Sequence, residues 1–265
     1  MTAIPFFQVD AFADQPFAGN PAAVMLLDGW LPDDVLQAIA AENNLSETAF
    51  LVPDASGDAD RELRWFTPTV EVALCGHATL ASGHVLLSEA APGGSVHLRT
   101  RKAGILRVEK TDAGYRLDLP AWPASPHPAV ESAAGIGGRP VATLWRDGGY
   151  CVLVYASEAE VRALVPDFAR LRQGGDTLFI ATAPGDRTDI VSRVFAPGAG
   201  VDEDPVTGSA HAVIVPYWAE RLGRAHFTAF QASARGGRLD CALAGDRVIL
   251  GGACVTVIEG RFTLR

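Results

Sequence analysis

Residues 47–51 read E-T-A-F-L, and residues 176–180 read D-T-L-F-I. In both halves a Phe-x-Pro triplet begins 19 residues after the first position of that stretch, F-T-P at 66–68 and F-A-P at 195–197. A small, glycine-containing run then opens an apolar stretch in each half, C-G-H-A-T-L-A-S-G-H at 75–84 and T-G-S-A-H-A-V-I-V at 207–215. Self-similarity at matched spacing is typical of a repeat, so we predict two copies of one structural unit.

The stretch between the two copies is rich in proline. It reads L-P-A-W-P-A-S-P-H-P from residue 119 to residue 128. Proline fits neither the interior of a helix nor a central strand. We therefore expect a linker at 120–128 between an N-terminal lobe at 1–122 and a C-terminal lobe at 129–265. The pattern leaves open that the last strand returns to the N-terminal lobe.

The apolar periodicity within each copy predicts its secondary structure. Helices are expected at 33–43, 78–87 and 210–222, and strands at 4–12, 48–52, 61–66, 150–155, 189–195 and 248–258. The two helices near 78 and 210 are apolar enough to be covered by strands. The sequence therefore predicts an α+β fold of two pseudo-symmetric lobes, each a curled, mostly antiparallel sheet around a central helix.

Charge and composition exclude several classes of function. The chain has 265 residues and a formal net charge of −9, which repels nucleic acid and anionic membrane surfaces. It contains neither a signal-like N-terminus nor an apolar run of membrane-spanning length, so we expect a cytoplasmic protein. The four cysteines and six histidines lack Cys-x-x-Cys and His-Glu-x-x-His spacings, which disfavours a metal site or a disulfide framework.

The two glycine turns could bind an anion. A helix that begins at Gly76 or Gly208 leaves its first N–H groups unbonded and carries partial positive charge there. Two such ends could hold a substrate carboxylate and stabilise enolate-like charge, which implies a small anionic metabolite as partner. The alternative is that both are ordinary helix starts, with Thr207 and Ser209 as caps.

Four side chains near these turns could carry chemistry. Glu47 opens a strand that is apolar on both faces, and withdrawal from water would raise its pKa toward that of a general base. A surface glutamate is the common alternative. His77 could equally be a hydrogen-bonded core residue, and Asp204 could form an Asx turn before Pro205. Cys75 stands at a helix start, where a thiol pKa is lowered.

Five motifs keep their order along nearly the whole chain: V-D-A-F at 9–12, G-N-P-A-A-V at 19–24, N-L-S-E-T-A-F at 44–50, F-T-P with C-G-H-A-T-L-A at 66–81, and E-D-P-V-T-G-S-A-H at 203–211. In these motifs the chain resembles the PhzF-like isomerases of phenazine biosynthesis, within the diaminopimelate epimerase-like fold. The resemblance implies two lobes with the active site between them, a homodimer, and neither metal nor organic cofactor.

The resemblance also implies roles for individual residues. The catalytic glutamate of the family falls on Glu47, its active-site histidine on His77, and the aspartate and serine of its second motif on Asp204 and Ser209. Gly76 and Gly208 stand at the two turns. Ala78 and Ala210 follow as substrate-binding positions, and we add Arg235, in the turn Q-A-S-A-R-G-G at 231–237, as a possible helper.

Two departures limit what the resemblance carries over. Cys75 and Ala78 replace an alanine and a proline of the phenazine enzyme, so its substrate, trans-2,3-dihydro-3-hydroxyanthranilate, is not carried over. Thr207 stands where the cysteine-pair epimerases and racemases have their second cysteine.

The sequence therefore predicts a cofactor-independent isomerase that shifts a proton by general acid–base catalysis on a small unsaturated carboxylate, with Glu47 as base. Two alternatives stay open: an epimerase or racemase that uses Cys75 and Glu47, and a non-catalytic small-molecule-binding protein of the same fold. A phosphate-binding enzyme is a weaker third, since neither glycine turn carries a lysine.

Overall fold

The computed structural model describes residues 2–264, which divide into two compact units. Unit 1 contains the described parts of Met1–Leu119 and Gly251–Arg265, and unit 2 contains Pro120–Leu250. The last strand of the chain therefore belongs to unit 1, the possibility that the sequence left open. The expected C-terminal lobe at 129–265 therefore included residues from Gly251 onward that belong to unit 1.

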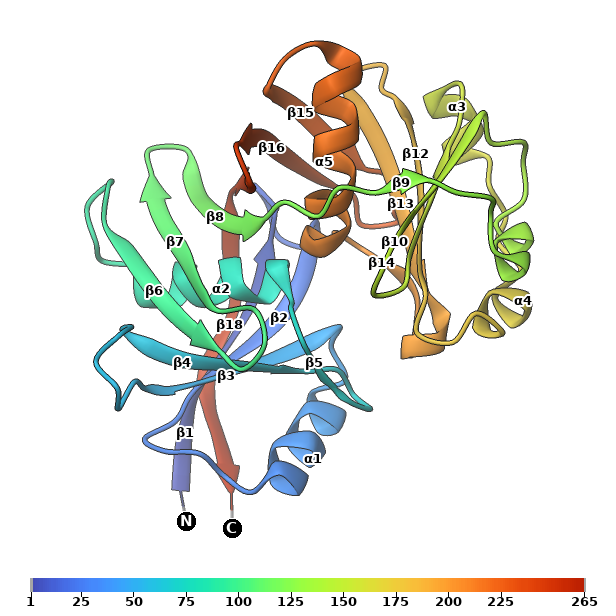
Figure 1. Cartoon of the computed structure of the whole chain (residues 1–265). Coiled ribbons are helices and arrows are strands. Elements are labelled where there is room, and N and C mark those ends of the chain that lie inside the picture. The colour runs from blue at the N-terminus through green and yellow to red at the C-terminus, as the bar shows by residue number, and fades with distance from the viewer. Residues whose placement is uncertain (1, 265) are drawn as a thin grey trace. The chain divides into compact units, whose positions relative to one another are not determined.

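Unit 1 is a sheet with two helices (Figure 1). Strand β2 runs antiparallel to β1 and parallel to β3, while β4 runs antiparallel to β3 and parallel to β6. Strand β7 is antiparallel to both β6 and β8, and β18 is antiparallel to β1. Its elements are β1 (Thr2–Ala11), β2 (Asn20–Leu26), α1 (Asp33–Asn43), β3 (Glu47–Pro53), β4 (Arg61–Phe66), β5 (Glu71–Val72), α2 (Gly76–Leu86), β6 (Ser95–Thr100), β7 (Ile105–Thr111), β8 (Gly114–Pro120) and β18 (Cys254–Leu264).

Unit 2 repeats this topology. Strand β11 is antiparallel to β10 and parallel to β12, while β13 is antiparallel to β12 and parallel to β15. Its elements are β9 (Ser125–Pro126), η1 (Glu131–Gly135), β10 (Ala142–Arg146), β11 (Tyr150–Val154), α3 (Glu158–Arg162), α4 (Phe168–Arg172), β12 (Leu178–Pro184), β13 (Ile190–Ala196), η2 (Pro197–Ala199), β14 (Val201–Asp204), α5 (Gly208–Leu222), β15 (His226–Gln231), β16 (Gly237–Ala244) and β17 (Arg247–Gly252), the last of which crosses the unit boundary.

The sequence repeat thus corresponds to a repeat in structure. From β1 to β7 and from β10 to β16, the pairings follow the same order of antiparallel and parallel neighbours. Most pairings are antiparallel, as expected, and each unit adds two parallel ones. The predicted α+β class is confirmed.

The central helix of each unit is buried. In α2, every residue from Gly76 to Gly83 is buried. Gly83 is required by this packing, since an added Cβ would lie 2.3 Å from Cγ1 of Val108 on β7. In α5, the residues from Gly208 to Val215 are buried as well. Figure 1 shows α5 beside β15 and β16.

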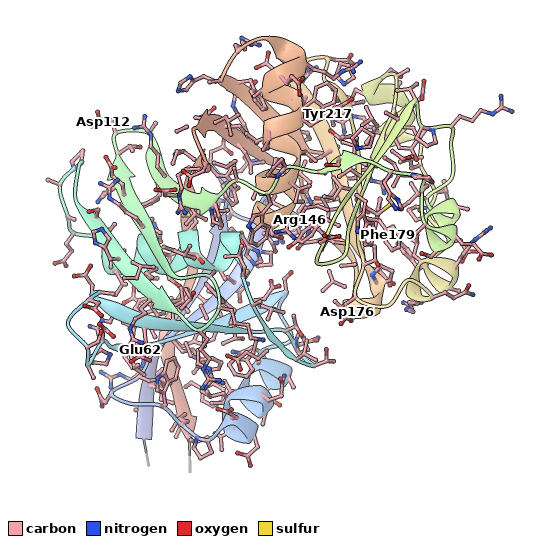
Figure 2. The ribbon with its side chains drawn as sticks, in the orientation of Figure 1. Glu62, Asp112, Arg146, Asp176, Phe179 and Tyr217 are labelled. Atoms are coloured by element: carbon pink, nitrogen blue, oxygen red, sulfur yellow. The ribbon has the colours of Figure 1, made fainter. Side chains whose placement is uncertain are left out.

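Smaller helices complete two further apolar cores. In unit 1, Leu36 and Ile39 of α1 pack with Phe50 and Phe66 of the sheet. Helix α1 spans the predicted residues and ends at Asn44, whose left-handed backbone (φ 49°) suits asparagine. In unit 2, η1, α3 and α4 form a core with β11, β12 and β13 around Phe179, which Figure 2 labels.

Two expectations need correction. The strand predicted at 248–258 is two strands, β17 and β18, because the chain leaves the ladder at Ala253, whose carbonyl accepts a hydrogen bond from the N–H of Ala13. The stretch 120–128 is part of unit 2 rather than a linker. The N–H groups of Ala121 and Trp122 donate to backbone carbonyls of unit 2, and β9 pairs with β10. Proline has no N–H to donate, but the residues between the prolines keep theirs and make these hydrogen bonds.

Candidate active site

Unit 1 brings three of the reactive side chains from the sequence together. Glu47 is the first residue of β3, Cys75 is the N-cap of α2, and His77 is the second residue of that helix. One ligand-type atom from each lies within 4.8 Å of the others. The N-terminal end of a strand and the N-terminal end of a buried helix therefore meet, and the repeat alone does not predict this convergence.

His77 is the centre of this cluster. Its Nε2 lies 3.2 Å from Oε2 of Glu47, while its Nδ1 lies 3.0 Å from Nδ2 of Asn20 and 3.5 Å from Sγ of Cys75. The ring is buried, and burial lowers the pKa of His77 from 6.5 to about 3. At neutral pH the imidazole is therefore uncharged, and it can donate one hydrogen bond and accept another.

The other two side chains differ in exposure. The side chain of Glu47 is 15% exposed, so its carboxylate keeps limited contact with solvent. Cys75 is buried, and its side chain makes no cap hydrogen bond to α2. Its carbonyl instead accepts hydrogen bonds from the N–H and the hydroxyl of Thr79. The carboxylate is thus the more accessible of the two groups.

The same three residue types can ligate zinc. Here, however, the two ring nitrogens of His77 face different neighbours, Nδ1 toward Cys75 and Nε2 toward Glu47. One ring nitrogen nevertheless lies within 4.8 Å of a ligand-type atom of each neighbour. The three side chains are therefore close enough to act on one small group.

Unit 2 places Asp204 at the end of β14, just before α5. The Thr207 hydroxyl donates to Oδ2 of Asp204, and the buried Gln231 holds the loop between them. Oε1 of Gln231 accepts from the N–H of Thr207 at 2.8 Å, and its Nε2 donates to the carbonyl of Asp204 at 2.6 Å. A fixed loop therefore presents the Asp204 carboxylate.

The first turn of α5 has no side-chain cap bond, as an anion site at a helix start requires, but it is buried. Gly208, Ser209 and Ala210 form its first turn and are buried, and the N-cap Thr207 makes no side-chain cap bond. The hydroxyl of Ser209 is hydrogen-bonded to Tyr150, whose pKa is raised by burial. In unit 1 the first turn of α2, Gly76, His77 and Ala78, is likewise uncapped by a side chain. Thr207 is therefore an N-cap residue without a side-chain cap bond, and Ser209 lies within the first turn rather than at the cap position.

Arg235 lies half-buried in the loop after β15. The Ser233 hydroxyl in this loop donates to the carbonyl of Pro205, and the N–H of Gly236 donates to Ser233. The loop is thus fastened to the segment that carries Asp204, which places Arg235 in the same neighbourhood of unit 2.

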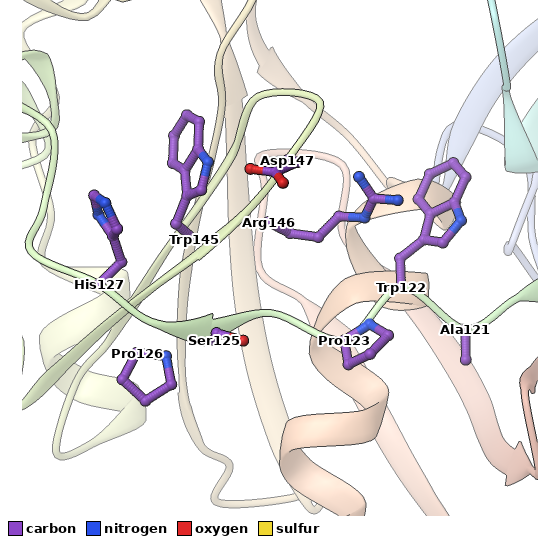
Figure 3. Close-up of a pocket in the computed structure, with 9 residues that line it drawn as sticks. All are labelled: Ala121, Trp122, Pro123, Ser125, Pro126, His127, Trp145, Arg146 and Asp147. Carbon is purple, nitrogen blue, oxygen red and sulfur yellow. The ribbon is translucent and has the colours of Figure 1, made fainter.

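A pocket of about 400 Å³ opens on unit 2 between the 121–127 stretch and the β10–β11 hairpin (Figure 3). The guanidinium of Arg146 stacks over the ring of Trp122, 5.0 Å from its centroid. The same indole lies 5.8 Å from the ring of Tyr150, the residue bonded to Ser209. The sequence did not single out this pocket.

Sequence reasoning missed three polar residues that support the predicted ones. They are Asn20 beside His77, Gln231 beside Asp204, and Tyr150 beside Ser209. Asn20 lies in the G-N-P-A-A-V motif, which we used only as part of a resemblance. Gln231 and Tyr150 lie in no motif, and only long-range contacts identify them.

Known proteins resemble the chain along its whole length. The model of the phenazine biosynthesis-like protein family matches residues 9–260. An uncharacterised isomerase of Pseudomonas aeruginosa is 51% identical over 98% of this chain and 99% of its own length. Relatives of this kind support isomerase activity at the level of the family.

Solved structures agree. A PhzF-family protein of Enterococcus faecalis is 41% identical with a TM-score of 0.89, over 99% of this chain and 100% of that one. A predicted epimerase of Pseudomonas aeruginosa, 21% identical with a TM-score of 0.74 over 99% and 100% of the two chains, shares the fold. In the described part of the chain, no helix is both long and apolar enough to cross a membrane. The family model and the relatives together show that this chain belongs to the phenazine biosynthesis-like, PhzF family.

Proposed function

We propose that the protein is a cofactor-independent isomerase that shifts a proton on a small, unsaturated, carboxylate-bearing substrate, with Glu47 as the general base. The observation that carries the proposal is the contact between Oε2 of Glu47 and Nε2 of a buried, uncharged His77. A carboxylate that keeps some solvent access beside a neutral hydrogen-bond donor is suited to accept a proton and to release it again.

The proton balance of the proposed reaction is simple. Glu47 removes a proton from a carbon next to, or conjugated with, the unsaturated carboxylate system. The C–H electron pair moves into that system, and Glu47 becomes a neutral carboxylic acid. The same acid then protonates another carbon of the system, which moves the double bond and restores the carboxylate. Because one group carries out both steps, the proton stays on one face of the substrate.

The remaining predicted residues are proposed to bind the anionic end of the substrate or to move a proton. Ser209 and the N–H groups at the starts of α2 and α5 are proposed to bind its anionic end, because uncapped helix N-termini attract carboxylates. Asp204 is proposed to relay or steer a proton, and Arg235 to assist anion binding. These roles follow the family resemblance and the local contacts within each unit.

We also propose that the protein acts on a small anionic metabolite as a cytoplasmic homodimer. The assembly rests on the family resemblance. Sedimentation velocity of the purified chain tests the assembly, and a purely monomeric species would exclude it.

The test of the base is Glu47→Gln, which keeps the shape of the side chain but cannot accept a proton. Loss of a general base costs about two to four powers of ten in rate, so kcat should fall by that amount or more while ligand binding persists. In deuterated water the wild type should exchange a substrate C–H, and the variant should not. Near-normal turnover by Glu47→Gln on a substrate that the wild type converts would disprove the proposal.

An epimerase is the second candidate, favoured by the closeness of Cys75 to Glu47. Epimerisation needs an acid and a base on opposite faces of one carbon, and only this reaction would invert a stereocentre. Circular dichroism of amino and hydroxy acids incubated with the enzyme distinguishes the two candidates.

A further inference from the structure

We infer that the outer edge of β18 pairs antiparallel with β18 of a second copy of the chain, about a two-fold axis at Gly260. This interface rests on the homodimer proposed above and names the surface that forms it. It uses none of the residues assigned to the reaction, so the interface and the chemistry can be tested apart.

Strand β18 is long and has one open edge. It spans Cys254–Leu264 and pairs with β1 (Figure 1). In the part of the chain that the structure describes, no second strand pairs with it. None of its 11 residues is buried, and 49% of Ile258 is exposed. An exposed edge strand of this length with apolar side chains is a template for pairing with another chain.

The charges of β18 are complementary to those of a second copy. In an antiparallel pair of identical strands the two-fold axis passes a residue that lies opposite its own copy, because opposed side chains point to the same face. With the axis at Gly260, Glu259 lies opposite Arg261 of the second copy, and Arg261 opposite the second copy's Glu259. Both side chains are exposed, and within the described residues neither has an ion-pair partner. The interface therefore contains two cross-strand ion pairs.

Neighbouring registers lack this complementarity. An axis at Glu259 or at Arg261 places that charge opposite its own copy, and like charges directly opposite each other destabilise a sheet. An axis at Ile258 places both charged side chains opposite valines. Charged residues on an edge strand normally prevent pairing. Here they have opposite signs and lie two positions apart, so they select one register instead of excluding all of them.

The same register joins the apolar residues of the two strands. Ile258 lies opposite the second copy's Phe262, on the same face of the ladder as Gly260. In the single chain that face belongs to the core of α1, where Phe262 packs beside its ladder partner Ile4. Pairs of an aromatic and a β-branched side chain stabilise adjacent strands. The half-exposed Ile258 thus gains a cover, and the apolar core continues across the axis.

Gly260 is not explained by its own chain. A Cβ added to it meets no atom within 4 Å, and it is not among the glycines with a positive φ. Glycine inside a strand weakens the strand and often marks the close approach of another backbone. A two-fold axis at this residue supplies such a backbone.

Charge reversal tests the register, with sedimentation velocity over a range of protein concentrations as the measurement. Glu259→Arg and Arg261→Glu should each raise the Kd of the dimer about tenfold to several hundredfold, because two attractive pairs become repulsive. An equimolar mixture of the two variants should recover a Kd near that of the wild type. One copy then carries two positive side chains at these positions and the other two negative ones, so recovery cannot come from the fold of either chain.

A matched control lies on β7. Arg107 and Glu109 are also two positions apart and form an ion pair, but β7 is paired on both edges, with β6 and with β8. Arg107→Glu and Glu109→Arg should therefore leave the Kd of the dimer unchanged. This comparison separates the edge of β18 from surface charge in general.

Gly260→Cys locates the axis directly. The new side chain meets no atom of its own chain, so folding should be unaffected. Opposed Cα atoms of an antiparallel pair lie about 4.5–5.5 Å apart, within reach of a disulfide. Mild oxidation should therefore give a covalent dimer on a non-reducing gel. Thr263→Cys is the control on the same exposed strand, because the two copies of residue 263 would lie six positions apart along the ladder, about 20 Å, and should not cross-link.

The possible failures are distinguishable. A purely monomeric wild type would overturn both this interface and the proposed homodimer. Single charge reversals that leave the Kd unchanged, a mixture no tighter than its components, or a dimeric Gly260→Cys that does not cross-link would overturn the interface alone. Failure of the proposed reaction would appear instead as turnover by Glu47→Gln, whatever the state of assembly.

Discussion

At the scale of single residues, the candidate site depends on buried amides as much as on charged groups. Asn20 contacts His77, and Gln231 fixes the loop of Asp204. The sequence named Glu47, His77, Asp204 and Ser209 because they lie in short motifs of recognisable order. It could not name the amides, because Asn20 and His77 are 57 positions apart and asparagine has many other uses in a chain.

Cys75 offers a prediction at this scale. Burial lowers the pKa of His77 to about 3, so its ring offers no imidazolium to activate the thiol of Cys75. We therefore expect Cys75→Ser to keep most of the activity. Thiol labelling of the native protein at pH 7 should be slow.

The control for this labelling is the same protein unfolded in denaturant, where all four cysteines should react at the ordinary thiol rate. Fast labelling of Cys75 in the native state, or a loss of several orders of magnitude in turnover for Cys75→Ser, would instead favour the epimerase with Cys75 as acid or base.

At the scale of elements, several helices and strands were predictable, because their apolar patterns are local. Helix α1 and strand β4 span the predicted residues, and α2 and α5 begin at the two expected glycines. The strand at 248–258 was wrong because the apolar pattern continues through Ala253 while the chain passes from unit 2 to unit 1. Periodicity reports which face is buried, but it does not report against which unit.

Gly83 should be the least replaceable glycine of α2. Alanine normally stabilises a helix interior by up to about 1 kcal/mol relative to glycine. At position 83, however, the new Cβ would meet the side chain of Val108, and overpacking costs about 1–3 kcal/mol. We expect Gly83→Ala to lower the free energy of unfolding in urea titrations.

Two further variants test this explanation. Gly83→Ala with Val108→Ala should recover part of the loss that the two single changes cause together, because the clashing methyl groups are gone. Gly29→Ala should be nearly neutral, since no atom lies within 4 Å of its added Cβ. Additive losses at 83 and 108 would contradict a steric cause.

The repeat also predicts twin ion pairs. Arg64 on β4 forms a two-point salt bridge to Glu71 and stacks over Phe66, while Arg193 on β13 does the same with Glu203 and Phe195. Breaking a buried pair costs about 3–5 kcal/mol. Glu71 is partly exposed, so water can solvate its carboxylate again when the arginine is removed. We therefore expect Arg64→Met to lower the free energy of unfolding by about 3 kcal/mol, the lower end of that range.

Chemical denaturation measures the effect, with Arg107→Met as the control. Arg107 pairs with Glu109 on the surface of β7, and exposed pairs contribute about 0–1 kcal/mol. Equal effects of the two substitutions would show that burial does not govern these pairs.

At the scale of the whole molecule, buried histidines make stability depend on pH. Burial lowers the pKa values of His77, His84 and His211, the first to about 3 and the last to about 4. In the folded state His77 and His211 stay neutral above pH 5, while in the unfolded chain they take up protons below about pH 6.5. Stability should therefore fall as the pH falls through 6.5, by about 1.4 kcal/mol per pH unit for each of these two histidines.

Urea titrations at several pH values between 7.5 and 5 measure how steeply the free energy of unfolding depends on pH. His211→Gln removes one titrating group and should reduce that slope by the contribution of one proton. This window lies above the range where carboxyl groups are protonated, so histidines dominate it. An unfolding free energy that is flat between pH 6.5 and 5 would contradict the burial of these rings.

The pairing of β1 with β18 affects how the chain is made. Thr2 lies opposite Leu264, so β1 pairs on one side with β2, which follows it directly, and on the other side with β18, which is synthesised after all of unit 2. Unit 2 can therefore close its own core while the sheet of unit 1 still has an open edge at β1. During translation that edge is where mispairing and aggregation would begin, and pairing with β18 removes the hazard at β1.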